Sequence, residues 1–403
     1  MAQYDIKLEA EELVDLLSNN DKFKCLAESI INQVLDAQMT EHLGAEYYAH
    51  DESRTGYRNG YRPRSLYTRI GHLNLRVPQT RDGSFSTEIF KRYQRKEQAF
   101  VLGLMEMYLE GVSTRKVANV TEALCGVSFS KSTVSELASE LDVKVNAFKK
   151  RKLDEKEYPF VVVDAMVIKV RKNDIVRSMS ILIAYGINND GWREILGLWL
   201  GDSESESTWS ILFKDLKLRG LSGVDLVISD NHSGLVKSLR RHFQGAAWQR
   251  CQVHFIRNVL DHTSSKNRKE IAEYLKAVLY AYNTETAKEL SEQFISKFEK
   301  TAKKAVTCFE DGIGDALTIL AYPLEYRQRL RTSNMAERIN EEIRRREKVI
   351  RIFPNEDAAI RLIGALIADF HDNWITDKRY LKMDIYHEWK KHINDPEKKV
   401  INL

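Results

Sequence analysis

The chain has 403 residues, 43% of them hydrophobic and 30% charged, with a formal net charge of only +4 at pH 7. This length predicts several domains, and so small a net charge favours no class of partner. The four cysteines are scattered, the N-terminus is acidic, and no apolar stretch reaches membrane-spanning length. These features argue against a disulfide scaffold, a signal peptide and a membrane protein, so we expect a cytoplasmic protein.

Residues 1–53 predict a helical N-terminal region. Apolar side chains recur at helical spacing from Phe23 to Leu43, and Gly44 follows as a C-cap. This stripe could pack within its own chain or against a second subunit, and the spacing does not choose between them. Our hypothesis is that the protein forms a homodimer and that residues 1–53 are its dimerisation region.

Residues 54–93 predict a basic arm for nucleic acid. Between residues 54 and 81 there are seven arginines, three interleaved tyrosines and no acidic residue. Arginine donates bidentately to phosphate, so this composition favours DNA contact over an ordinary solvated loop. The arginines are Arg54, Arg58, Arg62, Arg64, Arg69, Arg76 and Arg81.

Residues 94–150 predict a helix-turn-helix-like DNA-binding domain. Short helical segments separated by glycine are followed by a helix that opens with small polar residues. Lys131, Ser132 and Thr133 lie on that helix and are candidate DNA contacts.

Residues 151–254 predict an α/β core. Strands are expected at 159–170, 176–187 and 194–200, then a helix at 205–218, a strand ending at Asp230, a helix at 235–243 and a strand at 247–253. This order is that of a ribonuclease-H-like sheet, in which the first and fourth strands are neighbours. The expected fold is therefore multi-domain α/β with a ribonuclease-H-like catalytic core.

Two aspartates in this core indicate a metal site. Asp164 lies inside an apolar strand and Asp230 ends another, where an unpaired carboxylate is costly to bury. In the expected topology both meet at one edge of the sheet. Carboxylates there suit two Mg²⁺ ions, with Mn²⁺ able to substitute, and such a pair of ions supports phosphoryl transfer.

The rest of the chain predicts a helical insertion at 255–330, final core helices at 331–375 and a tail at 376–403. A helix from about 333 to 348 offers Glu337, Glu341 or Glu342 as a third carboxylate, and spacing does not choose among them. The same helix carries basic residues that could hold a DNA backbone: Arg338, Arg344, Arg345 and Arg346.

Cys251 and His254 form a Cys-x-x-His pair. By spacing it could be half of a zinc site, but no second pair with ligand spacing accompanies it. We therefore interpret the pair as structural, near the active site, and expect no zinc.

Several motifs together resemble the Mutator-type transposases of bacterial insertion sequences. The resemblance runs from about Arg54 to Trp374, and it is carried by the following segments: Arg58-Asn59-Gly60-Tyr61, Val77-Pro78-Gln79-Thr80-Arg81-Asp82-Gly83, Gly111-Val112-Ser113-Thr114-Arg115-Lys116-Val117, Ile228-Ser229-Asp230-Asn231-His232-Ser233-Gly234-Leu235, Trp248-Gln249-Arg250-Cys251-Gln252-Val253-His254-Phe255, Ser333-Asn334-Met335-Ala336-Glu337-Arg338-Ile339-Asn340 and Arg344-Arg345-Arg346.

The resemblance implies a DNA transposase whose catalytic, metal-binding carboxylates are Asp164, Asp230 and Glu337. It also implies double-stranded DNA partners, namely the inverted-repeat ends and a target, with Mg²⁺-dependent cleavage and strand transfer through a circular intermediate. Family members often have glycine after the first aspartate, where this chain has Ala165. The competing readings are a non-catalytic DNA-binding regulator and a ribonuclease-H-like nuclease.

Overall fold

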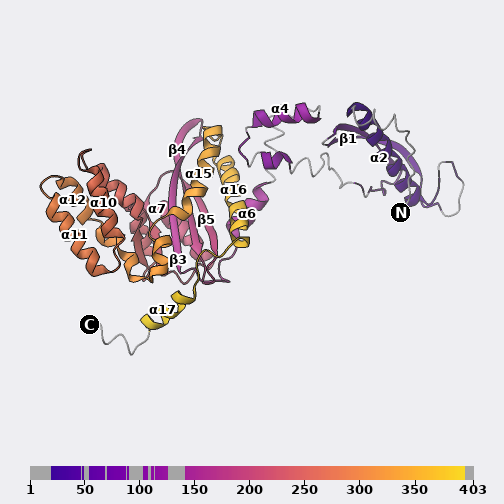
Figure 1. The fold of residues 1–403 in the computed structure, drawn as a ribbon. Coiled ribbons are helices and arrows are strands. Elements are labelled where there is room, and N and C mark those ends of the chain that lie inside the picture. Colours follow the sequence, from indigo (N-terminus) through magenta and orange to yellow (C-terminus); the bar gives the residue numbers. More distant parts are fainter. Residues whose placement is uncertain are drawn as a thin grey trace, which may run out of the picture. The chain divides into compact units, whose positions relative to one another are not determined.

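The computed structural model describes residues 20–46, 48–49, 54–68, 70–87, 89, 103–107, 110–112, 114–125 and 141–394. The chain divides into two compact units, Met1–Glu140 and Leu141–Leu403. Figure 1 shows their helices and strands with the labels used here.

The first unit contains a helix packed on a β-hairpin. The elements are α2 (Asn20–Leu43), β1 (Arg58–Thr68) and β2 (Gly71–Thr80), and the two strands pair antiparallel. Leu35 of α2 is buried among Leu66, Leu73, Leu75 and Val77 of the hairpin. The part of the α2 stripe around Leu35 therefore packs within its own chain, and the basic arm is a strand pair rather than a loop.

Two further helices flank the boundary between the units. They are α4 (Thr114–Cys125) in the first unit and α6 (Leu141–Lys150) at the start of the second. The expected helix that carries Lys131, Ser132 and Thr133 lies outside the described residues.

The second unit is built on a five-stranded mixed sheet. Its strands are β3 (Phe160–Lys172), β4 (Ile175–Ile187), β5 (Arg193–Gly201), β6 (Leu226–Ser229) and β7 (Ala247–Arg250), arranged in the order β5-β4-β3-β6-β7. The β3–β4 and β4–β5 pairs are antiparallel, whereas β6 runs parallel to β3 and to β7. The first and fourth strands of the sheet are therefore neighbours, as the element order predicts.

Helices cover the sheet (Figure 1). Val161 and Val163 of β3 pack in one apolar cluster with α7 (Glu206–Leu218) and α8 (Ser233–His242). Side chains alternate along a strand, so Phe160 and Asp164 point to the opposite face. There α15 (Asn334–Ile350) contacts β3, and α16 (Glu356–Thr376) contacts β3 and β5.

A helical segment follows β7. It comprises α9 (Gln252–Asp261), α10 (Arg268–Leu279), α11 (Thr284–Phe298), α12 (Lys303–Glu310), α13 (Ile313–Ala316), the 3-10 helix η1 (Thr318–Ala321) and α14 (Leu324–Leu330). Its own apolar core includes Phe255, Leu275 and Phe294. The strand expected to reach residue 253 ends at Arg250 instead, because the Gln252 N–H donates to Arg331 O, 3.0 Å away, and begins α9.

The C-terminal segment expected as a tail contains α17 (Asp384–Asn394). Tyr386 of α17 is fully buried against Phe160, and its hydroxyl donates to the Asp225 carboxylate. Lys390 pairs with the same carboxylate at 2.6 Å, so α17 is docked on the sheet unit. Within the described residues, no helix combines the length and apolarity needed to cross a membrane.

Candidate active site and nucleic-acid surface

The register of β3 and β6 places two aspartates side by side. Val162 is opposite Ile228 in the parallel pair. Asp164 lies two residues further along β3, and Asp230 directly follows Ser229, the last residue of β6. Residues at equal positions on neighbouring parallel strands share a face and lie about 5 Å apart. Long-range pairing, which the sequence only implied through element order, thus brings these two carboxylates together.

Asp164 is the better anchored of the two. Its Oδ2 accepts a hydrogen bond from Asn340 Nδ2 at 2.6 Å, and its Oδ1 accepts one from the Ala165 N–H at 2.9 Å. Burial raises the pKa of Asp164; the two hydrogen bonds oppose this shift and the charge of Asp230 adds to it. Asp164 and Asp230 are two neighbouring carboxylates, and Asp164 is buried. Their oxygens could act together as ligands of a divalent cation, whose charge would stabilise the ionised carboxylates.

Glu337 lies on α15 one helical turn before Asn340. Residues three apart share a helix face, so Glu337 belongs to the face of α15 that reaches Asp164 through Asn340. The Glu337 side chain is exposed. Among the described residues, no three His, Cys, Asp or Glu side chains are grouped closely enough to hold a metal ion. The direct contact from α15 is therefore made by Asn340, a residue that the sequence analysis did not single out.

Glu204 is a further carboxylate near the pair that the sequence analysis missed. It lies between β5 and α7, and its Oε1 accepts a hydrogen bond from Trp209 Nε1 at 3.3 Å and lies 3.6 Å from His232 Nδ1. Burial raises the pKa of Glu204, and the charge of Asp230 raises it further. The sequence could have indicated Glu204 as a candidate site residue, because it follows the end of a strand, as Asp230 does.

The Cys251 thiol joins two helix starts. Cys251 is the N-cap residue of α9, and its Sγ accepts hydrogen bonds from Ser333 N and Ser333 Oγ, both at 3.4 Å. Ser333 is the N-cap residue of α15 but makes no side-chain cap hydrogen bond there. The thiol therefore fixes the start of the helix that carries Asn340 and Glu337.

His254 stands beside this junction. Its Nδ1 is buried and has no partner at hydrogen-bonding geometry. The neighbouring thiol of Cys251 nevertheless raises the pKa of His254; burial opposes this, and the charges of Asp164 and Asp230 add to the rise. In Cys251, burial raises the pKa, but interactions with His254 and Ser333 outweigh it and lower the pKa overall. Cys251 and His254 therefore interact with each other, within reach of the charges of Asp164 and Asp230.

The cationic residues of α15 divide into two groups. Arg338, Arg344 and Arg345 are exposed, although Arg345 Nε also pairs with Glu342 at 3.0 Å. Arg346 is buried and pairs with Glu342. The sequence had placed the four arginines together as DNA contacts, but the helix turns Arg346 into the protein.

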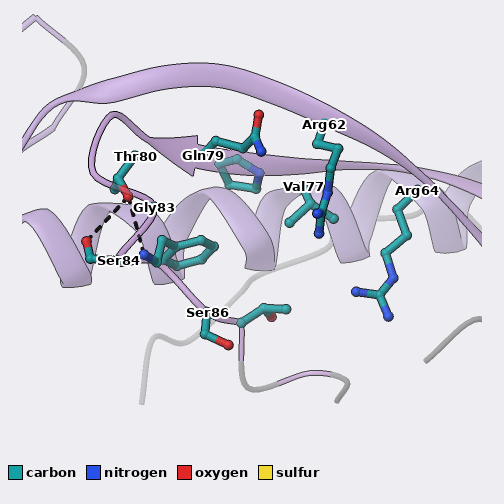
Figure 2. Close-up of a pocket in the computed structure, with 11 residues that line it drawn as sticks. Arg62, Arg64, Val77, Gln79, Thr80, Gly83, Ser84 and Ser86 are labelled. Atoms are coloured by element: carbon teal, nitrogen blue, oxygen red, sulfur yellow. Dashed lines mark hydrogen bonds between the residues drawn. The ribbon is translucent and has the colours of Figure 1, made fainter. Parts of the chain in front are cut away.

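The arginines of the hairpin also differ in their surroundings. Arg62 and Arg64 lie on one side of β1, and Figure 2 shows them beside a cavity of about 280 Å³ that the 83–87 segment also lines. Arg76 is exposed and stacks over Tyr61, and Arg81 lies over the Tyr57 ring.

Two other arginines of this region donate to their own chain. Arg54 donates to the carbonyls of Gly56 and Ala49, and Arg58 donates to Thr40 and Ala45 near the end of α2. Both thus help to hold the hairpin on α2. Arg69 lies outside the described residues.

Comparison with known proteins gives consistent matches along the chain. Residues 1–377 match the family model described as "Transposase, Mutator family". The chain is 43% identical over 390 residues to the transposase for insertion sequence element IS256 in transposon Tn4001 of Staphylococcus aureus, covering 95% of this chain and 100% of that protein. It is 43% identical over 376 residues to the ISRM5 transposase of Rhizobium meliloti, covering 93% and 94%. It is also 37% identical over 358 residues to the IS406 transposase of Burkholderia multivorans, covering 88% and 92%.

Proposed function

Because the chain belongs to the Mutator family of transposases, we propose that it binds the terminal inverted repeats of an insertion sequence and moves that element. The reaction is Mg²⁺-dependent DNA cleavage followed by strand transfer into target DNA, with a circular DNA intermediate. The protein acts on the bacterial nucleoid in the cytoplasm. The observation that carries this proposal is the parallel register of β3 and β6, which sets Asp164 beside Asp230 under α15.

The sheet unit is proposed to be a ribonuclease-H-like catalytic core. The strand order β5-β4-β3-β6-β7, in which β4 alone runs opposite to the other four strands, supports this assignment. The core spans 151–254 and 331–375, and the helical segment 255–330 is inserted before its last helices. Residues 54–93 and 94–150 form the DNA-binding regions.

Asp164, Asp230 and Glu337 are proposed as the catalytic carboxylates. Asp164 and Asp230 supply neighbouring oxygen ligands, and Glu337 supplies the third from α15. When bound, two Mg²⁺ ions provide charge stabilisation for the attacking and leaving oxygens of phosphoryl transfer, and Mn²⁺ would serve the same purpose. Asn340 orients the Asp164 carboxylate by donating to Oδ2, and Ala165 N–H donates to Oδ1, which leaves the remaining lone pairs of both oxygens for a cation.

DNA backbone binding is proposed for the exposed cations of both units and for the half-buried Arg64 beside the cavity at β1. The proposed contacts are Arg62, Arg64, Arg76 and Arg81 on the hairpin and Arg338, Arg344 and Arg345 on α15. Lys131, Ser132, Thr133 and Arg69 remain expectations from the sequence. Arg54, Arg58 and Arg346 are left out because their donors are used within the protein.

A homodimer is proposed because an element has two ends to be joined and symmetric dimers are the commonest oligomers. Leu35, Met39 and Leu43 of the α2 stripe are buried within the chain, whereas Ile30 and Val34 are only half-buried. Replacing both with Asp should lower the dimer fraction in sedimentation velocity. A double variant that sediments as the wild type does would place the interface elsewhere.

The catalytic proposal is tested with near-isosteric substitutions. Asp164→Asn, Asp230→Asn and Glu337→Gln should each abolish Mg²⁺-dependent cleavage of a duplex carrying the element end, while binding of that duplex persists. Glu341→Gln is the matched control, because Glu341 is exposed on the same helix, and it should cleave normally.

The same assay separates the alternatives. A regulator would bind the duplex and never cleave it, and a nuclease would cleave it without joining the cut end to target DNA. Cleavage that survives any of the three substitutions removes that residue from the site.

A further inference from the structure

Arg250, the last residue of β7, is a buried cation without a balancing charge. Its side chain and backbone together are only 4% exposed, and its Nε is buried with no hydrogen-bond partner. In the part of the chain that the structure describes, no carboxylate lies within ion-pairing distance of it. Its guanidinium sits over the Phe255 ring, 4.9 Å from guanidinium carbon to ring centre. An unpaired buried charge is costly, so this arrangement calls for an anionic ligand.

The nearest polar partner of Arg250 does not supply that charge. When the Asn258 amide is oriented to accept, its oxygen lies 3.1 Å from Arg250 Nη2, but an amide is neutral. Burial lowers the pKa of the Arg250 guanidinium, while the charges of Cys308, Asp315 and Asp230 oppose that shift. Arg250 therefore lies within electrostatic reach of the proposed catalytic aspartate without pairing to it.

A cavity of about 510 Å³ opens beside this side chain. Its lining joins Arg250 and Asn231 to Lys303, Lys304 and Thr307 of α12 in the helical segment. Both lysines are exposed, so they stand at the rim while Arg250 lies in the wall. Asp311 also lines the cavity, which leaves an excess of positive charge. The volume lies within the range of pockets that bind small ligands, roughly 300–1,000 Å³.

The cavity adjoins the proposed catalytic site through one residue. Asn231 lines it, and Asn231 directly follows Asp230 in the chain. A strand whose phosphate is cut at Asp164 and Asp230 would therefore pass this cavity within a few nucleotides. Guanidinium groups bind phosphate oxygens through paired N–H donors, and lysine adds point charge.

We propose that this cavity binds a backbone phosphodiester of the DNA strand that is cut, held by Arg250 in the wall and by Lys303 and Lys304 at the rim. The helical segment thereby clamps the strand next to the catalytic carboxylates. This inference rests on the proposed function, since it takes the DNA at Asp164 and Asp230 as the reacting strand. It adds a binding site that the arginine-rich hairpin and α15 do not provide.

The test uses the full-length chain and duplexes taken from the element end. Each duplex carries one methylphosphonate, which removes the charge of a single phosphate, at successive positions around the cut bond. For the wild type, one position should reduce strand nicking about tenfold. Arg250→Gln should lower nicking of unmodified DNA by a similar factor. With this variant, the methylphosphonate at that position should not reduce nicking any further, because the contact between Arg250 and that phosphate is already absent.

A second variant covers the possibility that Arg250→Gln does not fold. Lys303→Ala with Lys304→Ala changes only exposed side chains and should reduce the slope of log affinity against log salt by up to about 2. Lys276→Ala with Lys288→Ala is the matched control, because both lysines are exposed on helices of the same segment and do not line the cavity.

The outcomes separate this inference from the proposed function. If Asp164→Asn abolishes nicking but no methylphosphonate position couples to Arg250 or to the lysine pair, the cavity proposal is overturned and the catalytic one stands. If Asp164→Asn nicks as the wild type does while the coupling is found, the catalytic assignment fails and the phosphate site stands. Equal effects of the rim variant and its control would also overturn the cavity proposal.

Discussion

The junction between Cys251 and Ser333 gives the sharpest prediction about how the active site is held. Cys251→Ala removes the acceptor of the Ser333 N–H, in a residue that is only 6% exposed. An unsatisfied buried donor costs about 1–3 kcal/mol, and the missing sulfur leaves a small cavity that costs roughly 1 kcal/mol more. We therefore expect the free energy of unfolding to fall by about 2–4 kcal/mol, or a Tm lower by about 5–10 °C.

The same change should also reduce DNA cleavage. Because the thiol fixes the start of α15, its loss should loosen the Asn340 contact to Asp164. Val259→Ala is the matched control, since Val259 is fully buried on α9 and its truncation leaves the Ser333 junction intact. Both variants should lose stability in thermal unfolding followed by circular dichroism, but only Cys251→Ala should cleave the element end more slowly at a temperature where both are folded.

A double-mutant cycle decides whether the thiol and the serine act together. Ser333→Ala alone removes the Oγ donor and should cost about 1 kcal/mol. In Cys251→Ala with Ser333→Ala, the combined loss should fall short of the sum by at least about 0.5 kcal/mol. Strictly additive losses, together with cleavage equal to that of Val259→Ala, would refute the positioning role. One zinc per chain in metal analysis, lost in Cys251→Ser, would replace it with a metal site.

Three further predictions concern other parts of the protein. Arg62→Ala with Arg64→Ala should reduce the slope of log duplex affinity against log salt concentration by up to about 2. An unchanged slope would mean that the cavity beside β1 does not hold phosphate. Glu204→Gln, which keeps the size of the side chain, should slow cleavage about tenfold with unchanged end binding, because it removes a charge beside Asp230 and leaves the Trp209 contact possible; a wild-type rate would exclude Glu204 from the site. Burial, followed by the charge of Arg151, lowers the pKa of His371 to about 4, so the unfolded chain binds the proton more tightly than the folded one. The free energy of unfolding should therefore fall as the pH drops below 6.5, by at most about 1.4 kcal/mol per pH unit. Urea titrations between pH 7 and 5 should show that His371→Gln loses this pH dependence, and an equal slope in both proteins would contradict it.

The strands of the core were predictable because their signal is local. The apolar β-branched runs predicted 159–170, 176–187 and 194–200, and the structure has β3, β4 and β5 within one residue or two of those bounds. The element order, by analogy with a ribonuclease-H-like sheet, also predicted that the first and fourth strands are neighbours, and β3 and β6 do pair. The neighbouring positions of Asp164 and Asp230 followed from that pairing.

Other features were not accessible from local patterns. The end of β7 at Arg250 depends on the Gln252 N–H finding the Arg331 carbonyl, 79 residues later in the chain, and the docking of α17 depends on Tyr386 reaching Asp225. Periodicity reports that a helix has an apolar face, but it does not report which partner covers that face. The partner of Leu35 in the α2 stripe was therefore ambiguous until the hairpin was seen to cover this side chain.

The sequence by itself determined which residue types the chain offers: aspartates in apolar strands, arginines without counter-charges, and motifs that identify the family. Only the tertiary structure decided which of them face one another. It turned Arg346 inward onto Glu342, used Arg58 to hold α2, and set Asn340 rather than Glu337 in direct contact with Asp164. The physical reason is that a side chain's role depends on its exposure and on neighbours distant in sequence, and both are fixed by packing between elements rather than by the pattern within one.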